Sequence, residues 1–283
     1  MPGTLYVVAT PIGNLEDVTL RALRVLREVA VIAAEDTRRT ARLLQHYSIS
    51  TPTTSLHEHN EYARTPRLVE RLLAGDSVAL VSDAGTPAIS DPGSQLVTAA
   101  HAAGVRVEPI PGPNAAVAAL SASGIASDAG FVFSGFPPAK AVQRRKWLRA
   151  FASEPRPIVI YEAPHRITAT LSDIHHELGD RHIAVARELT KTHENLVVRQ
   201  ISWWLEHLPP ELGEFVVVIA PRSAVQEQSV TAPTDSLLSE TFGHLTDVDG
   251  LDRRSALKET GRQHGVSARD VFNALERTKN LGK

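Results

Sequence analysis

The sequence predicts an α/β fold with two α/β domains, a cofactor cleft between them, and a small C-terminal helical tail. Short apolar runs alternate with helical segments from Leu5 to Ile110, and a second series of this kind follows to about residue 222. The last thirty residues show the pattern of two short helices. A chain of 283 residues, 42% of them apolar, is long enough for two cores and a small third unit.

The first series begins with an apolar run at Leu5–Ala9, which predicts a strand. Asp17 or Thr19 can cap a helix that ends at Glu28, and Val29–Ala34 is a second strand. Further helices are expected at residues 64–73 and 94–103, and further strands at 77–81 and 105–110. Because these strands are apolar throughout and alternate with helices, they indicate a parallel sheet covered on both faces.

The second series starts after Pro111-Gly112-Pro113-Asn114, the best candidate for a domain boundary. Helices are expected at 115–123, 143–152 and 167–178, and strands at 131–133, 157–161, 183–186 and 215–220. We therefore expect one α/β domain at residues 1–113 and a second at 114–222.

The remaining residues differ in charge. Residues 222–252 hold one basic and six acidic residues, and we expect an acidic, polar linker at 223–250. From Arg253 to Lys283 there are eight basic residues against three acidic ones. Helices at 253–264 and 267–278, the second capped by Ser267, would form a helix-turn-helix-like tail at 251–283. A nucleic-acid contact and a solvated helical hairpin remain open for this tail.

Composition excludes several classes of protein. The net charge of −2 excludes a uniformly basic protein of the histone type, although basic patches are compatible with it. The absence of cysteine excludes disulfides, thiolate metal sites and cysteine nucleophiles. No stretch approaches 18 apolar residues and no signal peptide is recognisable, so we expect no membrane span and a cytoplasmic protein.

Three loops that follow predicted strands carry unusual residues: Thr10–Asn14, Glu35–Arg39 and Ser82–Gly93. In open α/β sheets, ligands bind beyond the carboxyl ends of the strands. The third loop contains two carboxylates, two glycines, two prolines and three hydroxyls, which favours a binding or catalytic role. We expect no metal, because hard-cation sites show more acidic ligands nearby. The sequence lacks a dinucleotide fingerprint, a Walker sequence and a serine-hydrolase motif.

Two basic segments suit a phosphate-bearing partner. In Glu35–Arg39, carboxylates beside guanidinium groups could poise an acid or base and hold a phosphate, or could simply cap a helix. Lys140–Arg166 holds seven basic residues against two acidic ones, with Trp147 among them. This segment could bind a nucleic-acid backbone, and a solvated helix with Trp147 in the core is an equal alternative.

Together, these motifs resemble those of the bacterial small-subunit ribosomal RNA 2′-O-ribose methyltransferases (methyltransferase I), a branch of the tetrapyrrole-methylase superfamily. The resemblance spans residues 4–222 and rests on Ala9–Leu15, Ala34–Arg38, Ser82–Gly93, Pro111–Pro113, Tyr161-Glu162 and Arg187–Glu194. The tetrapyrrole members have a glycine-richer first loop and carry Gly-Asp-Pro where this chain has Ala84-Gly85-Thr86-Pro87, which favours the ribosomal branch.

The resemblance implies S-adenosylmethionine bound between the two domains, a homodimer, and methylation of a cytidine ribose in the decoding region of 16S rRNA in the small ribosomal subunit. By motif position, it implies cofactor contacts from Ile12, Gly13, Asp83, Gly85, Thr86, Ile89, Asn114, Ala115, Tyr161 and Leu189.

Such a transfer needs the ribose hydroxyl aligned with the methyl group and its proton removed. Asp36, Asp83 and Glu194 are candidate bases, and Lys191 could orient the substrate or act as the base if burial lowered its pKa. The residues expected to contact RNA are Arg38, Arg39, Arg144, Arg145, Lys146, Arg253 and Arg254. Two other readings stay open: a methyltransferase of this fold for tetrapyrroles or other small molecules, and a ligand-sensing nucleic-acid-binding protein.

Overall fold

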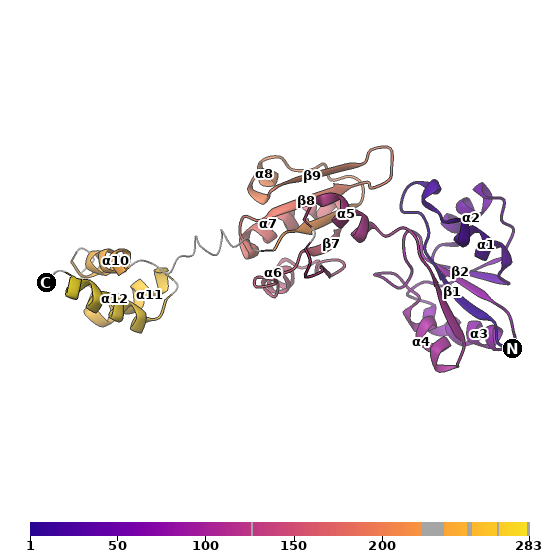
Figure 1. The fold of residues 1–283 in the computed structure, drawn as a ribbon, viewed down its shortest axis with the longest axis horizontal. Coiled ribbons are helices and arrows are strands. Elements are labelled where there is room, and N and C mark those ends of the chain that lie inside the picture. The colour runs from indigo at the N-terminus through magenta and orange to yellow at the C-terminus, as the bar shows by residue number, and fades with distance from the viewer. Residues whose placement is uncertain (126, 222–234, 248–250, 265, 282–283) are drawn as a thin grey trace. The chain divides into compact units, whose positions relative to one another are not determined.

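The computed structural model describes residues 1–125, 127–221, 235–247, 251–264 and 266–281 (Figure 1). The chain divides into two compact units at Pro221. The first unit contains two five-stranded sheets with helices, and the second is helical. The predicted α/β class with a helical tail is confirmed. Among the described residues, no helix combines the length and apolar character needed to cross a membrane.

The first sheet is parallel throughout, with strand order β3-β2-β4-β1-β5. Its strands are β1 (Thr4–Val8), β2 (Val31–Ala34), β3 (Thr53–Ser55), β4 (Val78–Val81) and β5 (Arg106–Ile110). The helices around it are η1 (Leu15–Asp17), α1 (Leu20–Glu28), α2 (Thr37–His46), α3 (Glu61–Leu73) and α4 (Ser94–Ala102). Of the two predicted caps for α1, the structure selects Thr19, whose hydroxyl accepts the backbone N–H of Ala22.

Both faces of this sheet are buried at the strands β2 and β4, which explains why these strands are apolar without alternation. On β2, Ile32 and Ala34 join the core that includes α1 and α2, whereas Val31 and Ala33 join the core that includes α3 and α4. Figure 1 shows the two helix pairs on opposite sides of the sheet.

The second sheet has the order β6-β7-β10-β8-β9, and only its β6–β7 pair is parallel. Its strands are β6 (Val132–Phe133), β7 (Ile158–Glu162), β8 (His182–Arg187), β9 (Asn195–Gln200) and β10 (Phe215–Ile219). The helices are α5 (Ala115–Ser123), α6 (Ala141–Arg149), η2 (Pro164–Arg166), α7 (Ile167–Leu178) and α8 (Ile201–Glu206). Helices α6, α7 and α8 contribute to the core on one face, and α5 to the core on the other.

The second unit consists of α10 (Asp235–Asp247), α11 (Arg253–His264) and α12 (Ala268–Leu281). Its core includes Leu238, Val271 and Leu275, so α10 packs with the two predicted helices. Helix α10 lies inside the segment expected to be a linker, and residues 222–234 and 248–250 of that segment lie outside the described residues. Ser267 caps α12 in a reciprocal arrangement with Asp270.

The structure corrects the expectation that Arg144 faces RNA. Its side chain is only 6% exposed and forms an ion pair of 2.7 Å with Asp173 of α7, which is 4% exposed. Arg145 also binds Asp173, yet it remains 47% exposed, and Lys146 is exposed. Trp147 packs against the core of the second sheet, so the alternative with a core tryptophan is the one that the structure supports.

This buried ion pair makes a stability prediction. Asp173→Asn leaves the buried guanidinium of Arg144 without an anion, and we expect the free energy of unfolding to fall by about 3–5 kcal/mol. Urea unfolding followed by tryptophan fluorescence measures this loss, because Trp147, Trp203 and Trp204 all contact the core of the second sheet.

The matched control is Glu154→Gln, which breaks the more exposed Glu154–Arg156 pair of the same domain, whose side chains are 17% and 42% exposed. We expect a much smaller loss there, because solvent screens exposed charges. Equal losses in both variants would contradict the assignment of a special role to the buried pair.

Candidate active site and cofactor cavity

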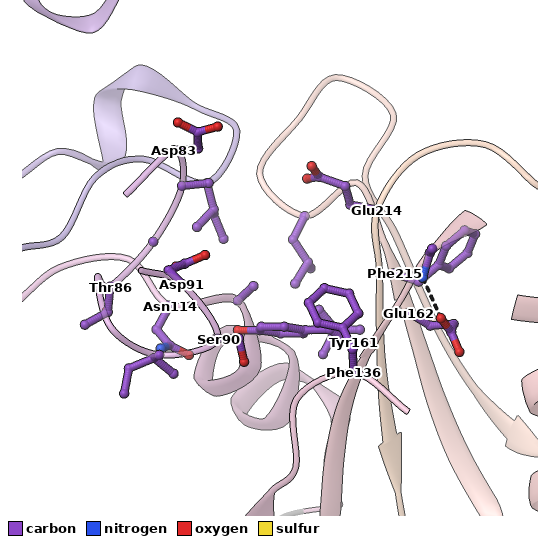
Figure 2. A pocket seen from close by; sticks show the side chains of 18 of the residues that line it. Asp83, Thr86, Ser90, Asp91, Asn114, Phe136, Tyr161, Glu162, Glu214 and Phe215 are labelled. Atoms are coloured by element: carbon purple, nitrogen blue, oxygen red, sulfur yellow. Dashed lines mark hydrogen bonds between the residues drawn. The ribbon is translucent and has the colours of Figure 1, made fainter. Parts of the chain in front are cut away.

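A cavity of about 430 Å³ is lined by residues of both α/β domains (Figure 2). The structure brings nine of the ten expected cofactor residues to this cavity. They are Ile12, Asp83, Gly85, Thr86, Ile89, Asn114, Ala115, Tyr161 and Leu189.

The tenth expected residue, Gly13, is not among the lining residues and has a different role. A Cβ atom at Gly13 would lie 2.5 Å from Cγ of Lys191 and 2.9 Å from the carbonyl oxygen of Leu189. Next to it, the backbone N–H of Asn14 donates to Oγ1 of Thr190 at 3.0 Å. The first loop therefore docks tightly on the loop that follows β8, and glycine permits this approach.

The loop after β4 is held in one shape at both ends. Near its start, Thr10 and Gly85 exchange two backbone hydrogen bonds of 2.9 and 3.0 Å. Near its end, the buried carboxylate of Glu61 accepts the backbone N–H groups of Gly93 and Gln95 at 3.0 and 2.8 Å and thereby caps α4.

This loop also has a strained backbone. Ala88 and Ser90 both have φ of 65°, a left-handed conformation that costs a residue with a Cβ atom roughly 1–3 kcal/mol. Such strain persists only where the surroundings enforce it and is found most often at functional sites.

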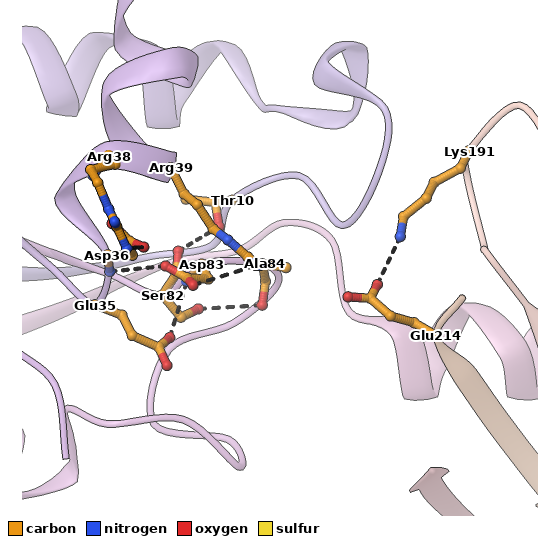
Figure 3. Close-up of polar contacts among 10 residues, drawn as sticks. All are labelled: Thr10, Glu35, Asp36, Arg38, Arg39, Ser82, Asp83, Ala84, Lys191 and Glu214. Atoms are coloured by element: carbon orange, nitrogen blue, oxygen red, sulfur yellow. Dashed lines mark hydrogen bonds and ion pairs between the residues drawn. The ribbon is translucent and has the colours of Figure 1, made fainter. Parts of the chain in front are cut away.

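Three carboxylates meet beside the cavity: Glu35, Asp83 and Asp91. Oε2 of Glu35 accepts the backbone N–H of Asp83 at 3.2 Å, and Oδ1 of Asp83 accepts the backbone N–H of Asp36 at 2.9 Å (Figure 3). Burial, together with the nearby charge of Glu35, raises the pKa of Asp91 to about 7, although a hydrogen bond from Ser82 opposes the rise. Burial also raises the pKa of Glu35.

The sequence analysis gave the loops of Glu35 and Asp91 a possible site role, but it named neither residue among the candidate bases or the cofactor contacts. Their proximity arises from tertiary contacts between two separate loops, and only the shared position after neighbouring strands hinted at it. The cavity therefore gathers more negative charge than the sequence predicted.

An aromatic wall closes the cavity on the side of the second domain. The ring of Tyr161 contacts Phe133 and Phe136 edge to face, with centroids 4.9 and 5.6 Å away, and Figure 2 shows Tyr161 beside Phe136. Phe136 was missed by sequence reasoning. Its loop is held by Arg166, which donates to the carbonyl oxygens of Pro137 and Pro138.

Glu162 lines the same cavity, but its carboxylate is engaged within the protein. It accepts hydrogen bonds from the hydroxyl of Thr170 and the backbone N–H of Ala163, and it lies 3.2 Å from Nε of Arg166. Because its acceptors are satisfied there, Glu162 supports the wall of the cavity.

The other candidate bases lie away from the cavity. Asp36 caps α2 by accepting the backbone N–H of Arg38 at 2.8 Å, and it also pairs with the side chain of Arg38 (Figure 3). The guanidinium of Arg38 holds the pKa of Asp36 well below its usual range. Glu194 accepts the backbone N–H of Thr190 within its own loop. The geometry thus gives Asp36 and Glu194 roles in local structure.

Lys191 lies between two carboxylates: Nζ is 2.8 Å from Glu188 and 2.9 Å from Glu214, and Figure 3 shows the contact with Glu214. Burial lowers the pKa of Lys191, but hydrogen bonds to the two carboxylates outweigh burial and raise it overall. Lys191 therefore stays charged at neutral pH, which favours an orienting role over a role as base.

The charge of the cavity indicates the kind of ligand that it suits. Five acidic residues line it, and Arg39 is the sole basic residue among the described lining residues. Glu162 is bonded within the protein and Glu214 is paired with Lys191, which leaves Glu35, Asp83 and Asp91 as the carboxylates nearest to one another. Nη1 of Arg39 lies 3.4 Å from Oδ2 of Asp83. A cationic ligand would be stabilised here, whereas a polyphosphate would be repelled. Among the described residues, no three histidine or acidic side chains are arranged to hold a metal ion.

The family model for tetrapyrrole (corrin/porphyrin) methylases matches residues 4–202 of the chain. The chain is 50% identical over 248 residues to ribosomal RNA small subunit methyltransferase I of Pseudomonas aeruginosa, covering 84% of this chain and 88% of that protein. It is 46% identical over 275 residues to the protein of the same name from Synechocystis sp., covering 95% and 96% of the two chains.

Solved structures show a similar fold at low identity. Uroporphyrin-III C-methyl transferase from Thermus thermophilus, complexed with S-adenyl homocysteine, matches with a TM-score of 0.56 and 20% identity, over 77% of this chain and 97% of that one. Diphthine synthase matches with a TM-score of 0.59 and 16% identity, over 80% and 94% of the two chains. By its fold, by the family model and by its relatives, the chain belongs to the tetrapyrrole (corrin/porphyrin) methylase family.

Proposed function

We propose that the chain is an S-adenosylmethionine-dependent methyltransferase that acts on the RNA of the small ribosomal subunit, at the ribose 2′-hydroxyl of a cytidine in the decoding region. The observation that carries this proposal is the anionic cavity between the two domains, which nine of the ten expected cofactor residues line. The names of the relatives at 46–50% identity support the RNA substrate. The 2′-hydroxyl and the cytidine rest on the motif resemblance.

The residues of the cavity fit this cofactor. When bound, S-adenosylmethionine supplies an electrophilic methyl group on a positively charged sulfur. Carboxylates of Glu35, Asp83 and Asp91 would offset that charge, and the wall formed by Tyr161 and Phe136 offers apolar and π surface.

Among the candidate bases, Asp83 has the most suitable position. It lines the cavity, is 22% exposed at its side chain, and is oriented by the backbone N–H of Asp36. In our proposal, Asp83 accepts the hydroxyl proton as the ribose oxygen attacks the methyl carbon and the carbon–sulfur bond breaks. Lys191 and Arg39 would orient the acceptor.

Two further assignments are part of the proposal: the chain acts as a homodimer, and it acts in the cytoplasm, where ribosomal RNA is modified. The homodimer rests on the motif resemblance, and size-exclusion chromatography with light scattering tests it. The α/β domains are assigned to residues 1–113 and 114–222, a division that leaves one sheet on each side.

One experiment separates this function from the alternatives. Labelled methyl groups are supplied as S-adenosylmethionine to purified small subunits that lack the modification, and the RNA is then digested with nucleases. A labelled 2′-O-methylcytidine supports the proposal. Label on a tetrapyrrole or another small molecule would support the small-molecule alternative, and absence of transfer combined with tight, sequence-selective DNA binding would support the ligand sensor.

Asp83→Asn tests the base. The amide keeps the shape of the side chain but cannot accept the proton, so we expect kcat to fall by about 100- to 10,000-fold at saturating cofactor. Asp36→Asn is the matched control, because asparagine also caps helices well and Asp36 lies outside the cavity. Full kcat in the Asp83 variant would remove this residue from the mechanism.

Cofactor binding should depend on pH through Asp91. Below its pKa of about 7 the carboxyl group is neutral, and above it the carboxylate attracts a cation. We expect the Kd for S-adenosylmethionine, measured by calorimetry, to fall as pH rises from 6 to 8. The change is about tenfold for each unit by which binding lowers the pKa.

Asp91→Asn is the control for this pH dependence, because any titration of the cofactor itself persists in the variant. An identical pH profile in the variant and the wild-type protein would show that Asp91 does not sense the ligand.

The helical tail carries exposed Arg253 and Arg254, which we propose contact RNA. Arg253→Ala/Arg254→Ala should weaken binding to small subunits and reduce the slope of log K against log salt by about two, one for each lost phosphate contact. Arg64→Ala/Arg67→Ala, on the exposed side of α3, is the control of equal charge. If the two double variants bind alike, the tail has no specific role in RNA binding.

A further inference from the structure

A second cavity, of about 400 Å³, adjoins the first, since Arg39, Asp83 and Glu214 line both. Its remaining walls come from the loop after β1, helix α2 and the loop after β8. The sequence indicated a basic face on α2, but it did not show that this face and Lys191 enclose one space.

The two cavities differ in charge. The first is lined by five acidic residues, one of them the internally bonded Glu162, and by a single arginine. The second has three cations, Arg39, Arg42 and Lys191, with Asp83 and Glu214 at the shared boundary. The other polar lining residues, Thr10, Thr40 and Ser82, are buried, and the hydroxyls of Thr10 and Ser82 donate to backbone carbonyl oxygens. An anionic ligand suits the three cations of this lining, and a sulfonium ion does not.

Within the second cavity, the cations differ in how far they are already neutralised. Lys191 is held by two carboxylates at 2.8 and 2.9 Å, and Arg39 lies 3.4 Å from Asp83. Arg42 is exposed, and within the described part of the chain no carboxylate is recorded at ion-pair distance from it. Three residues apart on α2, Arg39 and Arg42 lie on the same helix face.

We propose that the second cavity is the acceptor site, in which Arg42, together with Arg39, binds a backbone phosphate of the RNA strand and thereby places the neighbouring ribose at Asp83. This inference rests on the proposed function and specifies the substrate side of the same site. A guanidinium suits this task because it binds two phosphate oxygens at once. Arg38, one residue before Arg39, lines neither cavity and is engaged with Asp36.

Arg42 is a positioning residue in this proposal, and Arg42→Ala tests it. The measurements are kcat and KM with isolated small subunits that lack the modification, the dissociation constant for the same subunits at several salt concentrations, and the Kd for S-adenosylmethionine. We expect KM for the subunit to rise about tenfold, the salt slope to fall by about one, and cofactor binding to remain within twofold of wild type.

Arg42→Lys and Arg67→Ala make the test specific. Lysine keeps the charge but cannot bind two phosphate oxygens at once. Arg42→Lys should therefore show the salt slope of the wild-type chain and a KM between those of wild type and Arg42→Ala. Arg67→Ala removes an equal charge from an exposed site on α3 that lines neither cavity, and it should leave KM unchanged.

The failure of this inference is distinct from the failure of the proposed function. If the wild-type chain transfers no methyl group to the RNA of the subunits, the proposed function is overturned, and the inference with it. If the wild-type chain transfers it while Arg42→Ala shows the KM and salt slope of Arg67→Ala, the acceptor site in the second cavity is overturned and the proposed function stands. A loss of cofactor binding in Arg42→Ala would also overturn the inference, because it would place Arg42 on the cofactor side.

Discussion

The site depends on carboxylates held close together at the carboxyl end of the first sheet. Glu35 and Asp83 follow the neighbouring strands β2 and β4, and the loop after β4 returns Asp91 to the same place. Burial disfavours the charged form of Asp91 most, the neighbouring carboxylates add to this, and the raised pKa of Asp91, about 7, expresses the cost. A bound cation would relieve it, so the fold maintains an unfavourable arrangement that a ligand of the right charge makes favourable.

Such an arrangement persists only because the surroundings are rigid. The sheet below the loops is buried on both faces, and the loop after β4 is fixed by the backbone bonds between Thr10 and Gly85 and by the cap from Glu61. These contacts also hold Ala88 and Ser90 in left-handed conformations. The negative charge of the cavity therefore depends on core packing and loop anchoring, because these hold the carboxylates close together.

The sequence predicted the parts of this structure that depend on local pattern. Fully buried strands such as β2 and β4 are recognisable as apolar runs, and Thr19 and Ser267 have the residue types that cap helices. Strands β3 and β9 lie at sheet edges and expose much of their surface, so they lack such a run and were missed. Helix α10 was missed because the acidic and polar composition of its segment indicated a linker, and its burial comes from packing with α11 and α12.

The predictions that failed concern residues whose burial or role depends on contacts with distant parts of the sequence. Arg144 and Arg145 are adjacent in a basic segment, and only the position of Asp173, on another helix, determines which of them is buried. The same holds for Asp36, whose place at the start of α2 allows either a cap or a base until its distance from the cavity is known. The cofactor residues were predicted from the resemblance of motifs, because spacing alone does not show which loops converge.

Burial alone does not distinguish a reactive carboxylate from a structural one, and the partners of each group do. Glu61 and Glu162 are more deeply buried than Asp83, yet backbone N–H groups, a hydroxyl and Arg166 satisfy their oxygens, so their charge is used to hold loops in place. Asp83 accepts one short hydrogen bond, lies at 3.4 Å from Arg39, and faces both cavities. Its oxygen Oδ2 can still accept a hydrogen bond where the anionic first cavity meets the cationic second cavity. In the proposed reaction, the ribose hydroxyl lies between the positively charged methyl donor and the anionic RNA strand, so its proton would leave at that meeting point.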